Sequence, residues 1–207
     1  GLMDLFKINH IAIGLLSMIL LLAIVACDDT NSHQPIIPTE KLMQGDIAFR
    51  KGEGFVSDVV LYNDADGLYS HIGLIVNHND SIKVVHSVPG EGDYDGVKIE
   101  PIEMFYATSR AVKGEVLRME LNDEQRRVIG EIAIKKGIDK IEFDHDYNLN
   151  DTTQVYCTEL IKLLFNHIGI NIVEGRSTRV NIPGMSGDYI MPSDVYRNKK
   201  LISIYKY

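Results

Sequence analysis

Basic residues are scarce in this sequence. Lys and Arg together number 21 against 29 Asp and Glu, which gives a net charge of −8, and no basic run offsets this balance. A surplus of carboxylates repels the phosphate backbone of DNA or RNA, so we expect no nucleic-acid partner. The same surplus gives the folded domain no electrostatic attraction to anionic lipid headgroups.

Cysteine and tryptophan are also rare. The 207 residues contain no tryptophan and only two cysteines, Cys27 and Cys157. The two cysteines lie in segments of different kinds, so we do not expect a disulfide between them. The length and the near-average apolar content fit one domain with a sizeable core.

Only one long apolar run is present, and it lies near the N-terminus. The run "IAIGLLSMILLLAIVA" is 16 residues long, follows a short stretch with Lys7 and ends just before Cys27. It is shorter than the roughly 20 residues of a membrane-spanning helix, and "IVAC" resembles a bacterial lipobox, in which the cysteine is diacylated and becomes the new N-terminus. We therefore expect a membrane-anchored lipoprotein of the bacterial cell envelope. The alternative is an uncleaved N-terminal anchor helix.

These features predict three segments. Residues 1–27 form the lipoprotein-type signal peptide that ends at the acylated Cys27. Residues 28–41, which are polar and contain proline, form a flexible tether. Residues 42–207 form the folded domain.

Hydrophobic periodicity in the domain predicts an α+β fold, with an antiparallel sheet packed against helices. The sequence "GFVSDVVLYND" has helical spacing, and the Gly- and Asp-rich stretch 89–96 is expected to be a loop. Residues 122–137 are the clearest helix, with Asn122 and Gln125 as a capping box and Gly137 as the end. Strands are expected at 45–52, 70–80, 81–88, 97–100 and 114–121, the second and third of them as a hairpin.

Cys157 lies in the first turn of a second predicted helix, within "QVYCTELIKLLF". Unpaired backbone N–H groups at a helix N-terminus favour a thiolate and can stabilise an oxyanion, so we expect a reactive thiol with a pKa below the ordinary value. The alternative is a small buried hydrophobe, which is the common fate of a free cysteine.

Two of the seven histidines, His71 and His86, lie within predicted strands among apolar residues. A polar ring there needs a partner, and the hairpin brings the two residues to adjacent strands. This placement fits a general base, His71, held by an orienting group, His86. Two hydrogen-bonded sheet histidines without a catalytic role are an alternative. A metal site is a third possibility, but no further ligand shows recognisable spacing.

Four segments, "GDIAF", "YSHIGLIV", "FDHDYNLNDTTQVYCTELI" and "MPSDVY", together resemble the permuted papain-like branch of the NlpC-type cysteine hydrolases, the YiiX-like family. In ordinary papain-like enzymes the cysteine precedes the histidine, whereas here His71 precedes Cys157 by 86 residues. The resemblance implies a circularly permuted papain-like fold and a reaction that needs no metal or organic cofactor.

The resemblance also implies roles for particular residues. Cys157 is expected to be the nucleophile, His71 the general base and His86 the third polar residue, which brings no fixed negative charge. Tyr156 is a candidate substrate contact or, alternatively, a core aromatic. Glu159 is expected to be structural, because its carboxylate can bond backbone near the helix start.

The expected function is that of an exported cysteine hydrolase, an amidase or peptidase. It would cleave an amide or ester through a thioester on Cys157, with the backbone N–H of Cys157 as one oxyanion donor. The expected substrates are peptide crosslinks of the cell wall or N-acyl amides of lipids. The alternatives are a non-catalytic envelope binding module that keeps the fold, and a thioester acyltransferase.

Overall fold

The computed structural model describes residues 34–207 except 65–66, 92–93, 150 and 182–185. The predicted signal peptide, Cys27 and residues 28–33 of the predicted tether lie outside the described residues. Within the described part of the chain, no helix is both long and apolar enough to cross a bilayer.

The centre of the domain is a six-stranded antiparallel sheet with the strand order β4-β3-β2-β1-β5-β8. The prediction of an antiparallel sheet, with a hairpin formed by the strands that carry His71 and His86, is confirmed. The strands are β1 Ile47–Lys51, β2 His71–Asn77, β3 Ile82–Glu91, β4 Tyr94–Pro101, β5 Lys113–Arg118 and β8 Ile202–Lys206.

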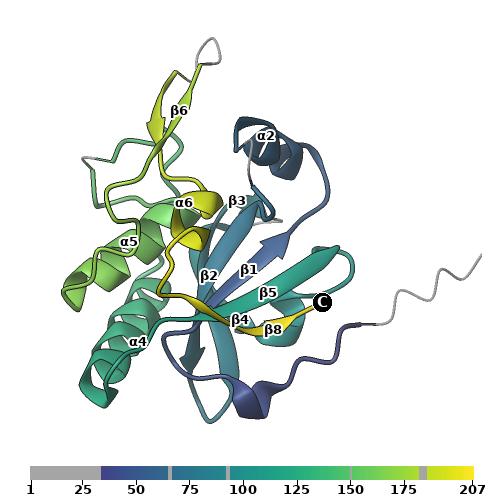
Figure 1. The fold of residues 1–207 in the computed structure, drawn as a ribbon, viewed down its shortest axis with the longest axis vertical. Coiled ribbons are helices and arrows are strands. Elements are labelled where there is room, and N and C mark those ends of the chain that lie inside the picture. The colour runs from purple at the N-terminus through teal and green to yellow at the C-terminus, as the bar shows by residue number, and fades with distance from the viewer. Residues whose placement is uncertain (1–33, 65–66, 92–93, 150, 182–185) are drawn as a thin grey trace, which may run out of the picture. The chain divides into compact units, whose positions relative to one another are not determined.

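Helices and one small hairpin surround this sheet. Figure 1 shows α4 and α5 on the same side of it, and both pack against β2 and β3. The remaining elements are short and lie around the sheet. The helices are η1 Thr39–Lys41, α2 Phe55–Asn63, α3 Ile102–Phe105, α4 Asp123–Ile138, α5 Cys157–His167 and α6 Pro192–Tyr196, and the hairpin joins β6 Thr178–Val180 to β7 Gly187–Tyr189.

The predicted capping box of α4 is confirmed. The Gln125 backbone N–H donates to Asn122 Oδ1 at 2.8 Å, and the Asn122 N–H donates to Gln125 Oε1 at 3.0 Å. The predicted end at Gly137 is wrong, because the helix continues to Ile138. A Cβ at position 137 would lie 2.4 Å from Ile99 Cγ1, so this glycine serves the close approach of α4 to β4 rather than a helix stop.

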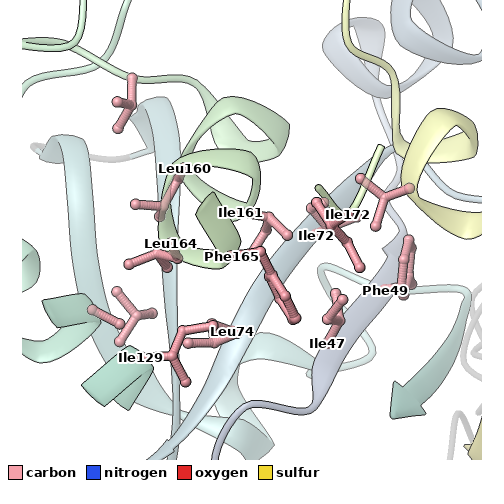
Figure 2. Packing of buried hydrophobic residues seen from close by; sticks show 14 of the residues in the cluster. Ile47, Phe49, Ile72, Leu74, Ile129, Leu160, Ile161, Leu164, Phe165 and Ile172 are labelled. Carbon is pink, nitrogen blue, oxygen red and sulfur yellow. The ribbon is translucent and has the colours of Figure 1, made fainter. Parts of the chain in front are cut away.

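Residues on the two faces of the sheet form two apolar clusters, because side chains alternate along a strand. The larger cluster lies between the sheet and helices α4 and α5, and Figure 2 shows Ile72 and Leu74 of β2 with Leu160 and Phe165 of α5 in it. The smaller cluster lies on the other face and includes Ala48, Ile75, Val84, Phe105 and Val116. The buried apolar residues of α5 are Leu160, Ile161, Leu164 and Phe165.

The predicted loop at 89–96 is wrong. Strand β3 extends to Glu91 and β4 begins at Tyr94, with a register irregularity between Val88 and Glu91. The Gly-rich composition has a different cause. Gly96 has φ of +129°, and a Cβ there would lie 2.4 Å from the Ile141 carbonyl oxygen. Glycine therefore lets another segment cross β4 closely.

Residues 34–41, which belong to the predicted tether, contact the domain. The Gln34 side chain donates to the carbonyl oxygens of Glu103 and Tyr106 at 3.0 and 3.2 Å. The Tyr205 hydroxyl donates to the Ile36 carbonyl at 3.0 Å. The described part of this segment is therefore attached to the domain, which begins before residue 42.

Candidate active site

Cys157 is the first residue of α5 and a free thiol. It is partly exposed, and it lines a cavity next to His71. Tyr156 is the N-cap residue in an extended conformation, so the helix N–H groups start at the cysteine. The predicted placement of Cys157 at a helix N-terminus is confirmed.

Hydrogen bonds from three directions fix the segment that carries Cys157. The Ser87 hydroxyl donates to the Val155 carbonyl at 2.6 Å, and the Val155 N–H donates to the Glu142 carbonyl at 3.1 Å. The Thr158 hydroxyl donates to the Ile190 carbonyl at 2.5 Å. Ser87 follows His86 directly on β3. This strand therefore holds both the His86 imidazole and the backbone at Val155, close to the nucleophile.

The pKa of the Cys157 thiol is raised above its ordinary value, contrary to the prediction. Burial is the main cause, and it outweighs the backbone N–H groups of Ile72, Thr158 and Cys157, which lower the pKa. A helix N-terminus favours a thiolate only where the stabilisation by its N–H groups exceeds the cost of removing the thiolate from water. The thiol is therefore protonated near neutral pH and needs a base to become a nucleophile.

The prediction that the His71 and His86 rings lie side by side is confirmed. The two atoms His71 Nε2 and His86 Nδ1 are 2.7 Å apart. Gly73 on β2 lets β2 and β3 approach closely here, since a Cβ there would lie 2.4 Å from Val84 Cγ1 and 3.0 Å from the Cβ of His86. The hydrogen bond occupies Nε2 of His71, so Nδ1 is the ring nitrogen that remains for a thiol.

A third residue, Glu100 on β4, completes this chain of contacts. Its Oε1 lies 2.9 Å from His86 Nε2, and its Oε2 lies 3.0 Å from Lys98 Nζ and 2.8 Å from Arg110 Nη1. Sequence reasoning missed Glu100 because position 100 reads as an ordinary solvent-facing strand residue before Pro101. A carboxylate in a strand expected next to the His86 strand was the available signal.

Burial and nearby cations keep both imidazoles neutral. Burial lowers the pKa of His71 well below its ordinary value, and the Arg50 guanidinium adds to this effect. Burial also lowers the pKa of His86 to about 4, although Glu100 opposes the change. Phe105 packs against both rings, with centroids 5.7 and 5.1 Å away, and Arg50 lies 4.7 Å from the centre of the Phe105 ring.

Cys157 and His71 face one cavity, but within the described residues no hydrogen bond joins the sulfur to the His71 ring. Catalytic hydrogen bonds are often long without substrate and shorten in the bound complex. The structure therefore places the thiol and the imidazole at one cavity without a direct hydrogen bond between them.

The cavity has a volume of about 260 Å³ and is mainly apolar. Helix α2, the β6–β7 hairpin, the start of α5 and the start of α6 all contribute to it, so segments far apart in the sequence form its walls. Its described lining contains no Asp, Glu, Lys or Arg. The apolar lining residues are Val56, Val59, Val60, Pro89, Phe143, Tyr147, Tyr156, Val180, Tyr189, Ile190, Met191 and Pro192.

Tyr156 and Glu159 flank the cysteine. The Tyr156 ring lines the cavity, while its hydroxyl accepts the Ile190 N–H at 3.0 Å, so the residue combines a core position with a place at the site. Burial raises the pKa of Glu159 to about 7, and the nearby Tyr156 backbone N–H opposes this change. This contact agrees with the structural role predicted for Glu159.

A cysteine that opens a helix packed on an antiparallel sheet, with a histidine pair on that sheet, defines a papain-like class of site. The model of one family, the permuted papain-like amidase enzymes YaeF/YiiX (family C92), matches residues 41–187. The chain belongs to this family, and the predicted YiiX-like membership and permuted papain-like fold are confirmed.

The fold is shared with solved structures. One of them is described as the metalloprotein yiiX from Escherichia coli O157:H7, and it matches with a TM-score of 0.66 at 19% sequence identity, covering 81% of this chain and 98% of its own. Among curated proteins, none matches the chain. In the described part of this chain, no group of three or more His, Cys, Asp or Glu is arranged to hold a metal ion.

Proposed function

We propose that the chain is a cysteine amidase that acts through a thioester. His71 Nδ1 takes the proton from Cys157, and the sulfur attacks the carbonyl carbon of an amide or ester. The backbone N–H of Cys157 stabilises the resulting oxyanion. His71 then donates the proton to the leaving amine or alcohol, and water cleaves the thioester in a second, similar step.

The observation that carries this proposal is the 2.7 Å contact between His71 Nε2 and His86 Nδ1 beside the cysteine cavity. It fixes the orientation of a neutral imidazole whose other nitrogen is available as a base. Family membership supports an amidase independently of this geometry.

The composition of the cavity favours one of the two expected substrate classes. Cell-wall peptides carry several charged groups, which need cationic or anionic partners in a binding site. The described cavity lining offers none, since His71 is neutral, and its valines and tyrosines suit an acyl chain. We therefore propose that the substrate is an N-acyl amide, with its apolar chain in this cavity.

The experiment is a hydrolysis assay with N-acyl amides of increasing chain length beside cell-wall peptides. Wild-type protein is expected to release amine from the acyl amides, and Cys157→Ala is expected to release none. Activity that survives in folded Cys157→Ala protein contradicts the thioester mechanism. Transfer of the acyl group to an added amine rather than to water identifies an acyltransferase instead.

The cavity assignment has a matched pair of variants on α2. Val56 lines the cavity and is 56% exposed, whereas Tyr62 is 83% exposed and lies outside the lining. Val56→Asp is expected to raise KM for long acyl amides, because a charge opposes burial of an apolar chain. Tyr62→Asp should leave KM unchanged. Equal KM values for both variants would place the acyl chain elsewhere.

We further propose that the protein is a membrane-anchored lipoprotein of the cell envelope, acylated on Cys27. The apolar run that ends in "IVAC" supports this proposal. Mass spectrometry of the membrane fraction is expected to find a lipid-modified N-terminal cysteine, and Cys27→Ser should release or mislocalise a folded domain. A mature chain that still begins near Met3 contradicts acylation.

A further inference from the structure

Glu100 is a buried carboxylate at the end of a continuous chain of contacts that leads to the cavity. Its Oε1 is 2.9 Å from His86 Nε2, and His86 Nδ1 is 2.7 Å from His71 Nε2. His86 is fully buried, and neither His86 Nε2 nor Glu100 Oε1 makes a well-aligned hydrogen bond to any described residue. At 2.9 Å they nevertheless form a close polar contact, which links Glu100 to the two histidines.

The order of these contacts determines where the protons lie. An ionised carboxylate only accepts hydrogen bonds, so His86 must carry its proton on Nε2. Neutral His86 then has an unprotonated Nδ1, which accepts the Nε2–H of His71. Neutral His71 is consequently unprotonated at Nδ1, the nitrogen required to accept a proton from the thiol.

We propose that Glu100 is a positioning residue that acts through His86 to hold His71 in the tautomer that can deprotonate Cys157. This inference rests on the proposed function and adds a fourth member to the site. When the S–H bond breaks and the Nδ1–H bond forms, His71 becomes an imidazolium. Glu100 stabilises that charge through His86 and does not itself need to receive a proton.

Neighbouring residues keep the Glu100 carboxyl ionised and hold its orientation. Burial alone would raise the pKa of its carboxyl, but contacts with His86 and Lys98 hold the pKa below its ordinary value. Lys98 and Arg110 both contact Oε2, so Oε1 remains directed at His86. The carboxylate thus supplies the fixed negative charge that the His71–His86 pair lacks.

A purely structural role is the competing explanation, since Glu100 also joins two cations on the sheet. A double-mutant cycle with His86 separates the two roles. With wild-type His86, Glu100→Ala is expected to lower kcat on the order of tenfold to a hundredfold with little change in KM. In a His86→Ala background the same substitution should change kcat less than about twofold, because no ring remains to orient.

An equal loss of kcat in both backgrounds would overturn the proposal. Glu100→Asp, which keeps the carboxylate, should recover part of the rate. If Glu100→Ala does not fold, Glu100→Gln enters the same cycle, because it keeps the shape and removes the charge. Glu115→Gln is the matched control: Glu115 is another buried carboxylate of this sheet, and it accepts the Tyr69 hydroxyl at 2.6 Å and contacts no histidine.

A second measurement needs no substrate. Nitrogen-15 NMR of the imidazoles is expected to show His71 of the wild type and of Glu115→Gln protonated at Nε2 only. In Glu100→Ala, a mixture of tautomers is expected. A His71 that keeps its single tautomer in folded Glu100→Ala overturns the proposal. A protein that gives the expected spectra but cleaves no amide refutes the proposed function and leaves the tautomer control by Glu100 supported.

Discussion

At the scale of single residues, His71 and His86 should differ in the kind of loss that follows their removal. His71→Ala removes the proton carrier and is expected to abolish turnover. His86→Ala frees the His71 ring and should lower kcat/KM on the order of tenfold to a thousandfold, or ~1.4 to 4 kcal/mol of transition-state stabilisation. The measurement is kcat/KM of the variants, with folding verified by thermal melts.

His86→Gln provides the control for this comparison. Its amide can accept from His71 and donate to Glu100, so it should retain more activity than His86→Ala. His86→Glu is not expected to do so, because it would place a second carboxylate beside Glu100, which lies 2.9 Å from the His86 ring. Full activity in folded His86→Ala would remove His86 from the site.

The pH dependence of turnover should reflect the lowered pKa of His71. Burial and Arg50 favour the neutral ring, so the base stays unprotonated below the ordinary histidine value of 6.5. The acid limb of kcat/KM is therefore expected below pH 6.5. His78→Gln, a change in a turn away from the cavity, should leave the profile unchanged. An acid limb at or above pH 6.5 would contradict the burial of His71 in the active protein.

At the scale of elements, α4 offers a test of how closely it packs on the sheet. A glycine-to-alanine change inside a helix usually stabilises by roughly 1 kcal/mol. Gly137→Ala should instead lower the free energy of unfolding by about 1–3 kcal/mol, because the new Cβ would lie 2.4 Å from Ile99 Cγ1 on β4. Urea unfolding measures the change.

Gly130→Ala in the same helix is the matched comparison. The atoms nearest to its Cβ belong to the far end of the Gln44 side chain, which can rotate away at the cost of its hydrogen bond to the Arg126 carbonyl. Its effect on the free energy of unfolding should be smaller than that of Gly137→Ala. The opposite order would show that α4 is not held tightly against β4.

Local signals made much of this architecture predictable. The capping box of α4, the β2–β3 hairpin and the position of Cys157 at the start of α5 depend on residues close in sequence. The error at Gly137 and the error at 89–96 share one cause. In both places glycine permits the approach of a distant segment, Ile99 or Ile141, and sequence-local reasoning cannot see such a neighbour.

The residues of the candidate site were predictable where residue type and the local element were sufficient. His71, His86 and Cys157 were identified from residue type and element, and the structure brings His71 and His86 into contact and places Cys157 at the same cavity. Glu100 was missed because its partner is set by strand register, His86 opposite Lys98. The raised pKa of the thiol was missed because it follows from burial, which depends on the packing of the whole domain.

At the scale of the whole molecule, the buried imidazoles should make stability depend on pH. His86 has a pKa of about 4 in the folded state against an ordinary 6.5 when unfolded, so the unfolded chain binds more protons between these values. The free energy of unfolding should therefore fall as the pH drops from about 6.5 toward 4. The loss from this residue is on the order of 3 kcal/mol.

Urea titrations at several pH values measure this loss. His71 adds to it in the same direction, and Glu100 adds a further loss below its ordinary value of 4.5, since the pKa of each is also lowered in the folded state. His86→Gln removes one titrating group, so its stability should vary less with pH than that of the wild type. An identical pH dependence for the two proteins would contradict a neutral, buried His86.

The permuted order of the chain has a consequence for how the protein folds. Glu100, His86 and His71 lie on consecutive strands within 30 residues, whereas Cys157 lies 86 residues beyond His71. Closing a short loop loses less chain entropy than closing a long one. We therefore expect the contacts among His71, His86 and Glu100 to form early in refolding. The thiol joins these residues only when α5 docks on the sheet. Time-resolved alkylation of Cys157 would then report a late long-range step of folding.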